Sequence, residues 1–223
     1  MVSVSLSYQN YVSNTRPKIL GIITRILYSS DNISFKGSFL CDQIPRIIIN
    51  KGSSLLIENN VYLRADVEIR AHENSKIIIE KDVKIDRGVR LLSTNNSTLR
   101  IGSNSSIGLY SVFNGGDDII IGNSCLISGF VYIQTSMHSH KKGIFVKEQG
   151  YSHSPINMGD DVWLGAHSTI LPGCKLGNGS IVGSNAVVTK SISSNEIVAG
   201  VPAEKGNAKP IASETHAIVL AVN

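Results

Sequence analysis

Large apolar side chains return at every sixth position along most of this chain. The pattern is clearest from Ile156 to Ala203, where a small or β-branched residue also stands four positions after each large one. A period of six matches neither a helix nor a plain alternating strand. It is typical of short parallel strands wound into a solenoid, in which each coil buries its large residues between the coils above and below. The large residues of this stretch, called heads below, are Met158, Leu164, Ile170, Leu176, Val182 and Val188.

The upstream half of the chain repeats the heads in a longer form. Triplets of heads begin at residues 35, 57, 79 and 101, a constant step of 22, whereas three hexads need only 18. The four extra residues form a polar, turn-rich corner, and an apolar residue two positions before the next head predicts a short strand extension there. Further triplets begin at 121, 158 and 176. We therefore expect one all-β domain at 35–203, of about seven coils and roughly 30 Å tall.

One interval breaks this spacing. The heads Ile121 and Met158 are 37 residues apart, where one coil needs 18. The excess, about 134–157, contains His138, His140 and His153. A long excursion from a regular solenoid is where binding and chemistry tend to occur.

The two ends of the chain lack the repeat. Segment 1–34 carries a helix signal at Asn14–Pro17, because proline is favoured in the first turn, and apolar residues then follow at helical spacing to Tyr28. We expect a cap on the first coil. The alternative is a basic amphipathic helix on a membrane surface, which predicts peripheral contact with the inner membrane. Segment 204–223 is expected to be a C-terminal tail that forms a cap, an edge strand or a disordered end.

Composition narrows the partners and the compartment. The chain has 21 basic and 17 acidic residues without a basic cluster, so we expect no nucleic-acid partner. The hexad register places Ser168 inside and Asp161 outside. It also places all three cysteines inside and far apart, which favours reduced thiols and a cytoplasmic protein. No apolar run is long enough to span a membrane, and the N-terminus lacks a signal-peptide pattern. The cysteines are Cys41, Cys125 and Cys174.

Over residues 35–203 the chain resembles the hexapeptide-repeat acyltransferases, which fold as a left-handed parallel β-helix. The most specific match begins at Pro155 and runs through GDDVWLGAHSTILPG and IVGSNAVVTKSI to VAGVPA at 198–203. Within that family the chain looks most like bacterial O-acetyltransferases acting on surface-polysaccharide sugars, whose loops are similar to MHSH at 137–140 and EQGYSHSPI at 148–156. The left hand of the coil comes from this resemblance, because crossover physics favours the right hand.

The resemblance implies a homotrimer with acetyl-coenzyme A bound between neighbouring β-helices and a saccharide or polysaccharide acceptor. His138, the first histidine of the loop motif, matches the family's general base, and His140 is the alternative. A neutral imidazole with a pKa of about 6.5 can take the proton of a sugar hydroxyl as it attacks the thioester. The tetrahedral oxyanion then needs a donor such as a backbone N–H, and no covalent intermediate is required.

The same match implies further site residues. Trp163 corresponds to a tryptophan that lines the pantetheine or acceptor groove, with a trimer contact as the alternative. Lys190 corresponds to a position near the cofactor phosphates, with a solvated charge as the alternative. Glu204 departs from the basic residue usual in relatives, which puts a phosphate contact there in doubt. The remaining candidates are Gly165, Ala166, Ser184, Pro202 and Ala203 for the cofactor, and Asn114, His140 and Tyr151 for the acceptor.

Other functions stay open. A zinc lyase on the same solenoid would need three converging histidines, and His138 and His140 could supply two of them beside a neighbour's histidine. A non-catalytic scaffold would not need the histidine-containing loop. An N-acetyltransferase of an amino-sugar nucleotide is the runner-up among acetyltransferases. Such enzymes often carry an N-terminal nucleotide-binding domain, for which segment 1–34 is too short, and this favours O-acetyl transfer.

Overall fold

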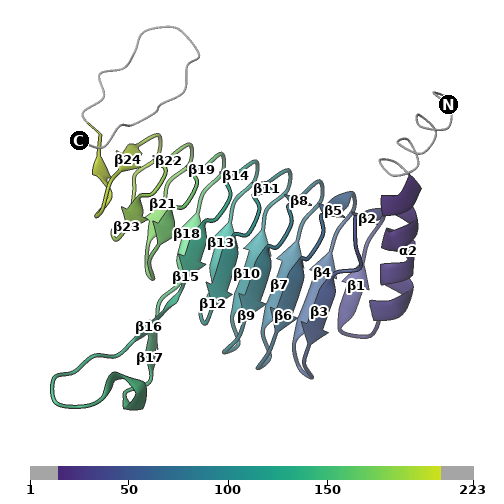
Figure 1. The fold of residues 1–223 in the computed structure, drawn as a ribbon, viewed down its shortest axis with the longest axis horizontal. Coiled ribbons are helices and arrows are strands. Elements are labelled where there is room, and N and C mark those ends of the chain that lie inside the picture. The colour runs from purple at the N-terminus through teal and green to yellow at the C-terminus, as the bar shows by residue number, and fades with distance from the viewer. Residues whose placement is uncertain (1–14, 207–223) are drawn as a thin grey trace, which may run out of the picture.

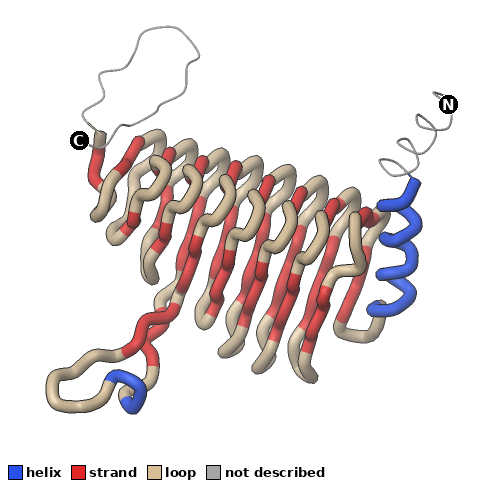
Figure 2. The backbone as a smooth tube through the Cα atoms, viewed as in Figure 1, coloured by secondary structure: helices blue, strands red, loops and turns tan. Residues whose placement is uncertain are grey.

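Each triplet of heads forms one coil of three short strands, and the coils stack into a parallel β-solenoid of about seven turns (Figure 1). The computed structural model describes residues 15–206; residues 1–14 and 207–223, with the predictions that fall on them, lie outside the described part. Figure 2 shows the strands lying in rows that run the length of the stack. The expected all-β solenoid is confirmed.

Three sheets form the faces of the solenoid, and the chain visits them in the order A, B, C in every coil. Sheet A comprises β1 (Ile33–Phe35), β4 (Ser54–Ile57), β7 (Lys76–Ile79), β10 (Thr98–Ile101), β13 (Ile119–Ile121), β18 (Ile156–Met158) and β21 (Lys175–Leu176). Sheet B comprises β2 (Phe39–Cys41), β5 (Val61–Leu63), β8 (Lys84–Ile85), β11 (Ser106–Ile107), β14 (Leu126–Ile127), β19 (Trp163–Leu164), β22 (Ile181–Val182), β24 (Ile197–Ala199) and β25 (Glu204–Lys205). Sheet C comprises β3 (Arg46–Ile49), β6 (Glu68–Ala71), β9 (Arg90–Ser93), β12 (Val112–Gly115), β15 (Tyr132–Gln134), β20 (Thr169–Ile170) and β23 (Val187–Val188).

The strand register reproduces the spacing of the heads. Ile57 pairs with Ile79 and Met158 with Leu176, at steps of 22 and 18 residues. Ile121 pairs with Met158 across the long interval, so the solenoid continues as if the excursion were absent. All the heads are buried, and they form one continuous hydrophobic core. Ser168 is fully buried and Asp161 is exposed, as the register predicts.

The four-residue corners of the upstream coils are held by a ladder of buried serines. Ser75 is fully buried, and its backbone N–H donates to the hydroxyl of Ser53 at 3.1 Å. The Ser75 hydroxyl donates to the carbonyl of Ser93 at 2.7 Å. The ladder satisfies backbone groups at a corner where sheet pairing stops. The apolar residues before the next heads extend the strands of sheet A, as expected.

Helix α2 (Arg16–Tyr28) covers the N-terminal end of the stack (Figure 1). Gly21 faces the first coil, and a Cβ there would lie 1.9 Å from the carbonyl oxygen of Phe39, so only glycine allows this approach. Thr24 is buried with its hydroxyl 3.4 Å from the sulfur of Cys41. The helix therefore forms the expected cap. In residues 15–206 no helix has the length and apolar character needed to cross a bilayer.

The excursion is an ordered hairpin that projects from the solenoid (Figure 2). Strands β16 (Ser136–His138) and β17 (Tyr151–His153) pair antiparallel, and a single turn of 3-10 helix, η2 (Val146–Glu148), lies in the connection between them. The sequence predicted an excursion at about 134–157 and left its internal structure unassigned. Its limits are narrower, because Gln134 still belongs to β15 and β18 already begins at Ile156.

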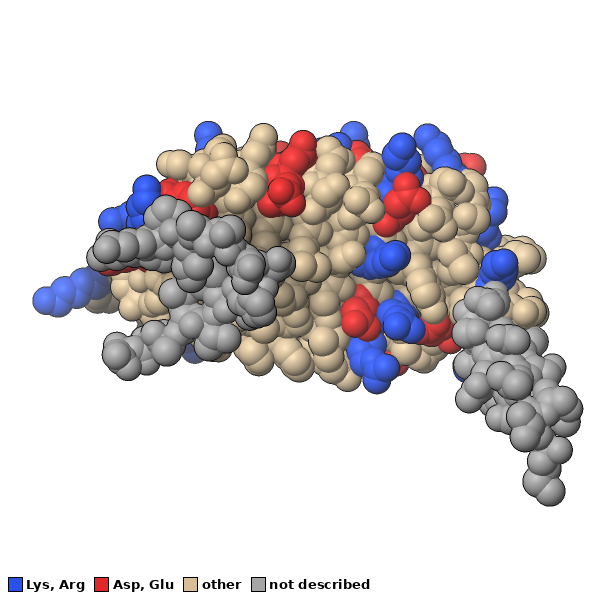
Figure 3. Space-filling view, turned by 90° about the horizontal axis from the view of Figure 1, so that it is seen from above, with Lys and Arg blue, Asp and Glu red and all other residues tan. Residues whose placement is uncertain are grey.

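The outer surface carries mixed charge. Figure 3 shows basic and acidic side chains interspersed over one face of the molecule. Glu68 lies within 3.3–3.7 Å of three arginines on neighbouring coils or on its own strand. The three cysteines are free and buried, and this burial raises the pKa of each thiol. They are core side chains, as predicted.

The C-terminal tail begins as an edge strand, since β25 pairs antiparallel with β24.

Candidate functional site

The hairpin is fixed to the solenoid by Thr135, which is fully buried at its base. The Thr135 hydroxyl accepts hydrogen bonds from the backbone N–H groups of Gly116 and Asp117 at 2.8 and 2.9 Å. Its carbonyl accepts the N–H of Ser154 from the returning strand at 2.9 Å. Thr135 thus joins the hairpin to the corner of the preceding coil through its side chain, and joins the two legs of the hairpin through its backbone carbonyl.

His153 also lies at the base of the hairpin. Its Nδ1 lies 2.9 Å from the hydroxyl of Ser136, and its Nε2 lies 3.4 Å from the side-chain amide of Asn95. Both ring nitrogens therefore have neighbours. Asn114 lies at the root of the hairpin in β12, where its carbonyl accepts the N–H of Thr135 at 3.1 Å.

His138 ends β16 with an exposed side chain, and its ring lies 4.2 Å from that of Tyr151 on the paired strand. Nδ1 of His140 lies 3.4 Å from the His138 carbonyl. The two histidines border a hollow of about 590 Å³ between the hairpin and the following coils. Its other lining residues include Ser152, Ser154, Leu171, Pro172 and Thr189. The structure thus brings His138, His140 and Tyr151 together. Lys190 is exposed and directly follows Thr189 in the chain.

Trp163 lies elsewhere, on the outer side of sheet B. Its side chain is 38% exposed, and the indole N–H donates to the hydroxyl of Ser128 at 3.3 Å. Ser128 was not predicted from the sequence. It occupies the position one residue after the head Ile127, at the end of the strand next to that of Trp163.

The other cofactor candidates form a line along the corner between sheets B and C. A Cβ on Gly165 would lie 2.5 Å from the backbone nitrogen of Ser184, so these two coils touch without side chains between them. The carbonyl of Ala166 accepts the N–H of Asn185 at 2.9 Å. On the next coil, the N–H of Ala203 donates to the carbonyl of Val187 at 2.8 Å. Pro202 precedes Ala203 in the same exposed turn.

A second unpredicted feature continues this corner. The exposed rings of Tyr110, Phe130 and His167 stack in order, with centroid separations of 5.5 and 4.8 Å. Each stands three residues after a head and has a positive φ of 53–60°. That shared position in the hexad is the signal by which the sequence could have revealed the stack. His167 faces outward.

One chain therefore holds the candidate residues in two separate groups. The hairpin leaves the solenoid between β15 and β18, at the corner from sheet C to sheet A, and carries His138. Trp163 and Gly165 lie on sheet B and at its corner with sheet C. Within residues 15–206 no group of three His, Cys, Asp or Glu side chains is placed to hold a metal ion.

The coils around Trp163 match a known sequence family. Residues 155–190 match the family described as bacterial transferase hexapeptide (six repeats). The chain is 32% identical over 153 residues to a Mycobacterium tuberculosis protein named as an acetyltransferase, covering 67% of this chain and 50% of that protein. It is 33% identical over 153 residues to WbbJ of Escherichia coli, named as a lipopolysaccharide biosynthesis O-acetyl transferase, covering 64% of this chain and 73% of WbbJ.

A solved structure shares the fold. The polysialic acid O-acetyltransferase OatWY superposes with a TM-score of 0.54 and 21% identity, over 84% of this chain and 93% of that one. At this identity the similarity concerns the fold. The chain spans half the length of the mycobacterial relative.

Proposed function

Since the chain belongs to the hexapeptide-repeat acetyltransferase family, we propose that it transfers acetyl from acetyl-coenzyme A to a hydroxyl of a bacterial surface-polysaccharide sugar. The observation that carries this proposal is the position of His138. It is an exposed histidine at the end of an ordered strand, beside a hollow and next to a second histidine. The similarity to WbbJ supports a sugar hydroxyl as the acceptor.

In the proposed reaction the neutral imidazole of His138 removes the proton of the acceptor hydroxyl as the oxygen attacks the thioester carbon. The negative charge moves to the thioester oxygen and returns when the carbon–sulfur bond breaks, and the thiolate leaves with a proton. Tyr151 lies against the His138 ring and restricts its orientation. A backbone N–H at the corner beside Trp163 would stabilise the oxyanion.

We assign the cofactor to the corner between sheets B and C. Gly165 and Ala166 on one coil and Ser184 on the next leave the backbone accessible there because their side chains are small. The pantetheine arm of acetyl-coenzyme A would run along this corner, with Trp163 at the thioester end and Pro202 and Ala203 near the adenine. Lys190 lies at another corner of the same chain, so it would reach the phosphates of a cofactor bound by a neighbouring subunit.

The separation of the two groups supports a homotrimer as the active form. His138 and Trp163 lie on different sides of one solenoid, whereas a second copy could place its hairpin against the coils of the first. Each of the three sites would then lie at a subunit boundary. Sedimentation analysis should show a trimer, and a fully active monomer would contradict this assignment.

Helix α2 has an exposed apolar side that is compatible with the expected membrane contact. Its outward side exposes Ile22, Ile26 and Leu27 by 59–76%, and the helix carries basic residues but no acidic one. We propose that this side rests on an anionic membrane surface from the cytoplasm, where acetyl-coenzyme A is available. Ile26→Ser should weaken sedimentation with phosphatidylglycerol vesicles, and unchanged binding would exclude this contact.

The decisive experiment is mass spectrometry of surface glycans from cells with and without this protein, followed by reconstitution with acetyl-coenzyme A. We expect an O-acetyl group that depends on the protein and is removed by mild base. A base-stable acetyl amide would favour the runner-up, N-acetyl transfer to an amino-sugar nucleotide. Stoichiometric zinc in the purified protein would favour a lyase, and the absence of any acetyl transfer would favour a scaffold.

A further inference from the structure

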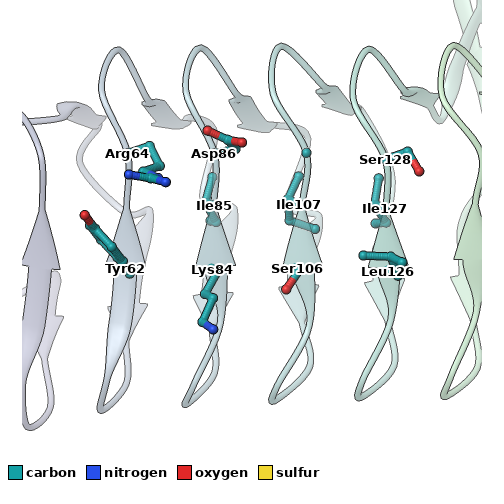
Figure 4. A pocket seen from close by; sticks show the side chains of 11 residues that line it. Tyr62, Arg64, Lys84, Ile85, Asp86, Ser106, Ile107, Leu126, Ile127 and Ser128 are labelled. Carbon is teal, nitrogen blue, oxygen red and sulfur yellow. The ribbon is translucent and has the colours of Figure 1, made fainter.

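A second hollow, of about 480 Å³, lies on the outer side of sheet B, away from the hairpin. It extends over β5, β8, β11 and β14, and none of the functional assignments above includes it. Figure 4 shows Tyr62 and Arg64 at one end and Leu126 and Ser128 at the other. The middle is open because Ser106 and Gly108 have small side chains. We call this hollow the sheet B groove.

Two rows of outward residues line the groove, and the strand register continues both rows to the candidate cofactor residues. In the first row Tyr62 pairs with Lys84, Lys84 with Ser106, and Ser106 with Leu126, which pairs with Trp163. The second row stands two residues further along each coil. It contains Arg64, Asp86, Gly108, Ser128 and Gly165.

The groove is joined to the candidate site by a direct contact. The Trp163 indole donates to Ser128, which closes one end of the groove. Four strand spacings separate Trp163 from Tyr62, or about 19 Å at about 4.8 Å per spacing. That length exceeds one sugar ring, so a ligand that filled the groove from Trp163 to Tyr62 would be a chain of several units.

The far end of the groove is rigid and polar. Tyr62 donates a hydrogen bond to Asp42, and Arg64 lies 3.2 Å from the other oxygen of the same carboxylate. The Arg64 guanidinium also lies 5.4 Å from the centre of the Tyr62 ring. Burial and the neighbouring Asp42 raise the pKa of Tyr62, which keeps its hydroxyl protonated. Lys84 is exposed in the same row, and within residues 15–206 it forms no ion pair.

These features fit a saccharide chain. A pyranose presents a flat C–H face and a rim of hydroxyls that both donate and accept hydrogen bonds. The groove offers the Tyr62 ring and Leu126 as apolar surface, with Lys84 and Arg64 as donors and Asp86 as an acceptor. An acyl chain has no hydroxyls and would leave Lys84, Arg64 and Asp86 without hydrogen-bond partners from the ligand.

We propose that the sheet B groove binds the distal sugars of an extended oligosaccharide acceptor, while the sugar that receives acetyl lies beyond Trp163. This inference rests on the proposed O-acetyl transfer and narrows its substrate class to oligosaccharides or polysaccharides. It assigns acceptor-binding roles to Tyr62, Lys84 and Ser106, which act on substrate length and take no part in proton transfer.

Ser106→Trp tests this assignment by filling the groove. The fold should tolerate the change, because Trp163 and Leu126 occupy the same outward row on nearby coils. Ser34→Trp is the matched control, since Ser34 is an exposed outward residue in β1 on sheet A. Lys84→Ser is a second variant that removes a wall of the groove without adding bulk.

The acceptors are a monosaccharide and a graded series of oligosaccharides, prepared by partial hydrolysis of the polysaccharide that the wild-type protein acetylates. For wild type, kcat/KM should rise with acceptor length. Ser106→Trp should lower kcat/KM for the longest acceptors roughly tenfold through KM, a change worth about 1.4 kcal/mol, and leave the monosaccharide unaffected. Lys84→Ser should act in the same direction, and Ser34→Trp should match wild type at every length.

Four outcomes would overturn the inference. If wild type acetylates all lengths equally well, or if Ser106→Trp and Ser34→Trp behave alike while both melt normally, the groove does not bind acceptor and the proposed function stands. If Ser106→Trp does not fold and Lys84→Ser has wild-type kinetics at every acceptor length, the groove again does not bind acceptor and the proposed function stands. If wild type binds acetyl-coenzyme A but acetylates no saccharide of any length, the proposed function itself fails.

Discussion

The solenoid coils and the hairpin are consecutive parts of one chain, yet they are stabilised in different ways. Leu164 in a coil is fully buried and pairs on both sides, with Ile127 and Val182. Met137 in the hairpin is 41% exposed, and among residues 15–206 its strand pairs with β17 alone. The tip of the hairpin exposes Phe145 by 73%.

This difference means that the coils provide most of the stability, whereas the hairpin carries the candidate catalytic residues. The coils gain free energy by burying apolar surface between neighbours, so their inward residues are constrained to be apolar and of similar size. The hairpin contributes little to the core, which leaves its residues free to be histidine, serine and tyrosine. Segments with few buried contacts also open at low free-energy cost. We therefore expect substitutions in the coils to affect folding and substitutions in the hairpin to affect turnover.

The largest contrast should come from placing aspartate in each region. Leu164→Asp should prevent folding, because an unpaired carboxylate in the core costs several kcal/mol. Met137→Asp should change the free energy of unfolding by only about 0.5 kcal/mol, as expected for an exposed site. Thermal melting of both variants measures this. An unchanged melting curve for Leu164→Asp would show that the hexad register is wrong.

His138→Ala should separate turnover from folding within the hairpin. We expect roughly 10²–10⁴-fold slower turnover, the usual effect of removing a positioned general base, with unchanged melting and acetyl-coenzyme A binding. Raising the pH should partly restore the rate, because the higher hydroxide concentration helps to remove the acceptor's hydroxyl proton in place of His138. Steady-state kinetics with a glycan acceptor measures the effect.

His140→Ala is the matched control for that experiment. Its side chain borders the same hollow, so it should reduce turnover much less than His138→Ala. If His140→Ala is inactive and His138→Ala is active, then the base lies two residues further along and the match of the loop motif is out of register.

Thr135→Val tests the junction between the two regions. Valine has nearly the same shape but cannot accept the N–H groups of Gly116 and Asp117, so we expect a loss of about 1–3 kcal/mol in stability. The hairpin base should loosen, and turnover should fall as well. Denaturant unfolding of Thr135→Val and of Thr169→Val, whose threonine points outward from β20, measures the difference. Equal stability of the two variants would mean that Thr135 does not anchor the hairpin.

The smallest effect concerns thiol reactivity. Burial raises the pKa of Cys41, Cys125 and Cys174, so native protein at pH 8 should react slowly with Ellman's reagent, and the rate should rise as the pH increases. Ser152→Cys places a thiol on the exposed strand β17 and should react rapidly. Rapid reaction of the three native thiols would indicate that the coils open easily.

The coils were predictable from the sequence because their stability depends on a local rule. A head at every sixth position is buried whatever the corner contains, so Ile57 and Leu164 could be placed without coordinates. The inward side of Ser168, the helix that ends at Tyr28 and the position of the long excursion follow from the same kind of local pattern. A family resemblance then indicated His138 and Trp163.

The hairpin and the sheet B groove depended on contacts between distant residues. The β16–β17 pairing joins Met137 to Ser152 through a connection without a short turn signal, so the sequence indicated only an irregular loop. The repeat steps are enough to align the residues from Tyr62 to Trp163 in one row. The depth of the groove depends on the size and orientation of the side chains that line it. The separation of His138 from Trp163 has the same origin. A periodic sequence determines which residues face inward, whereas the outward positions acquire a site only when the winding of the chain brings several coils side by side.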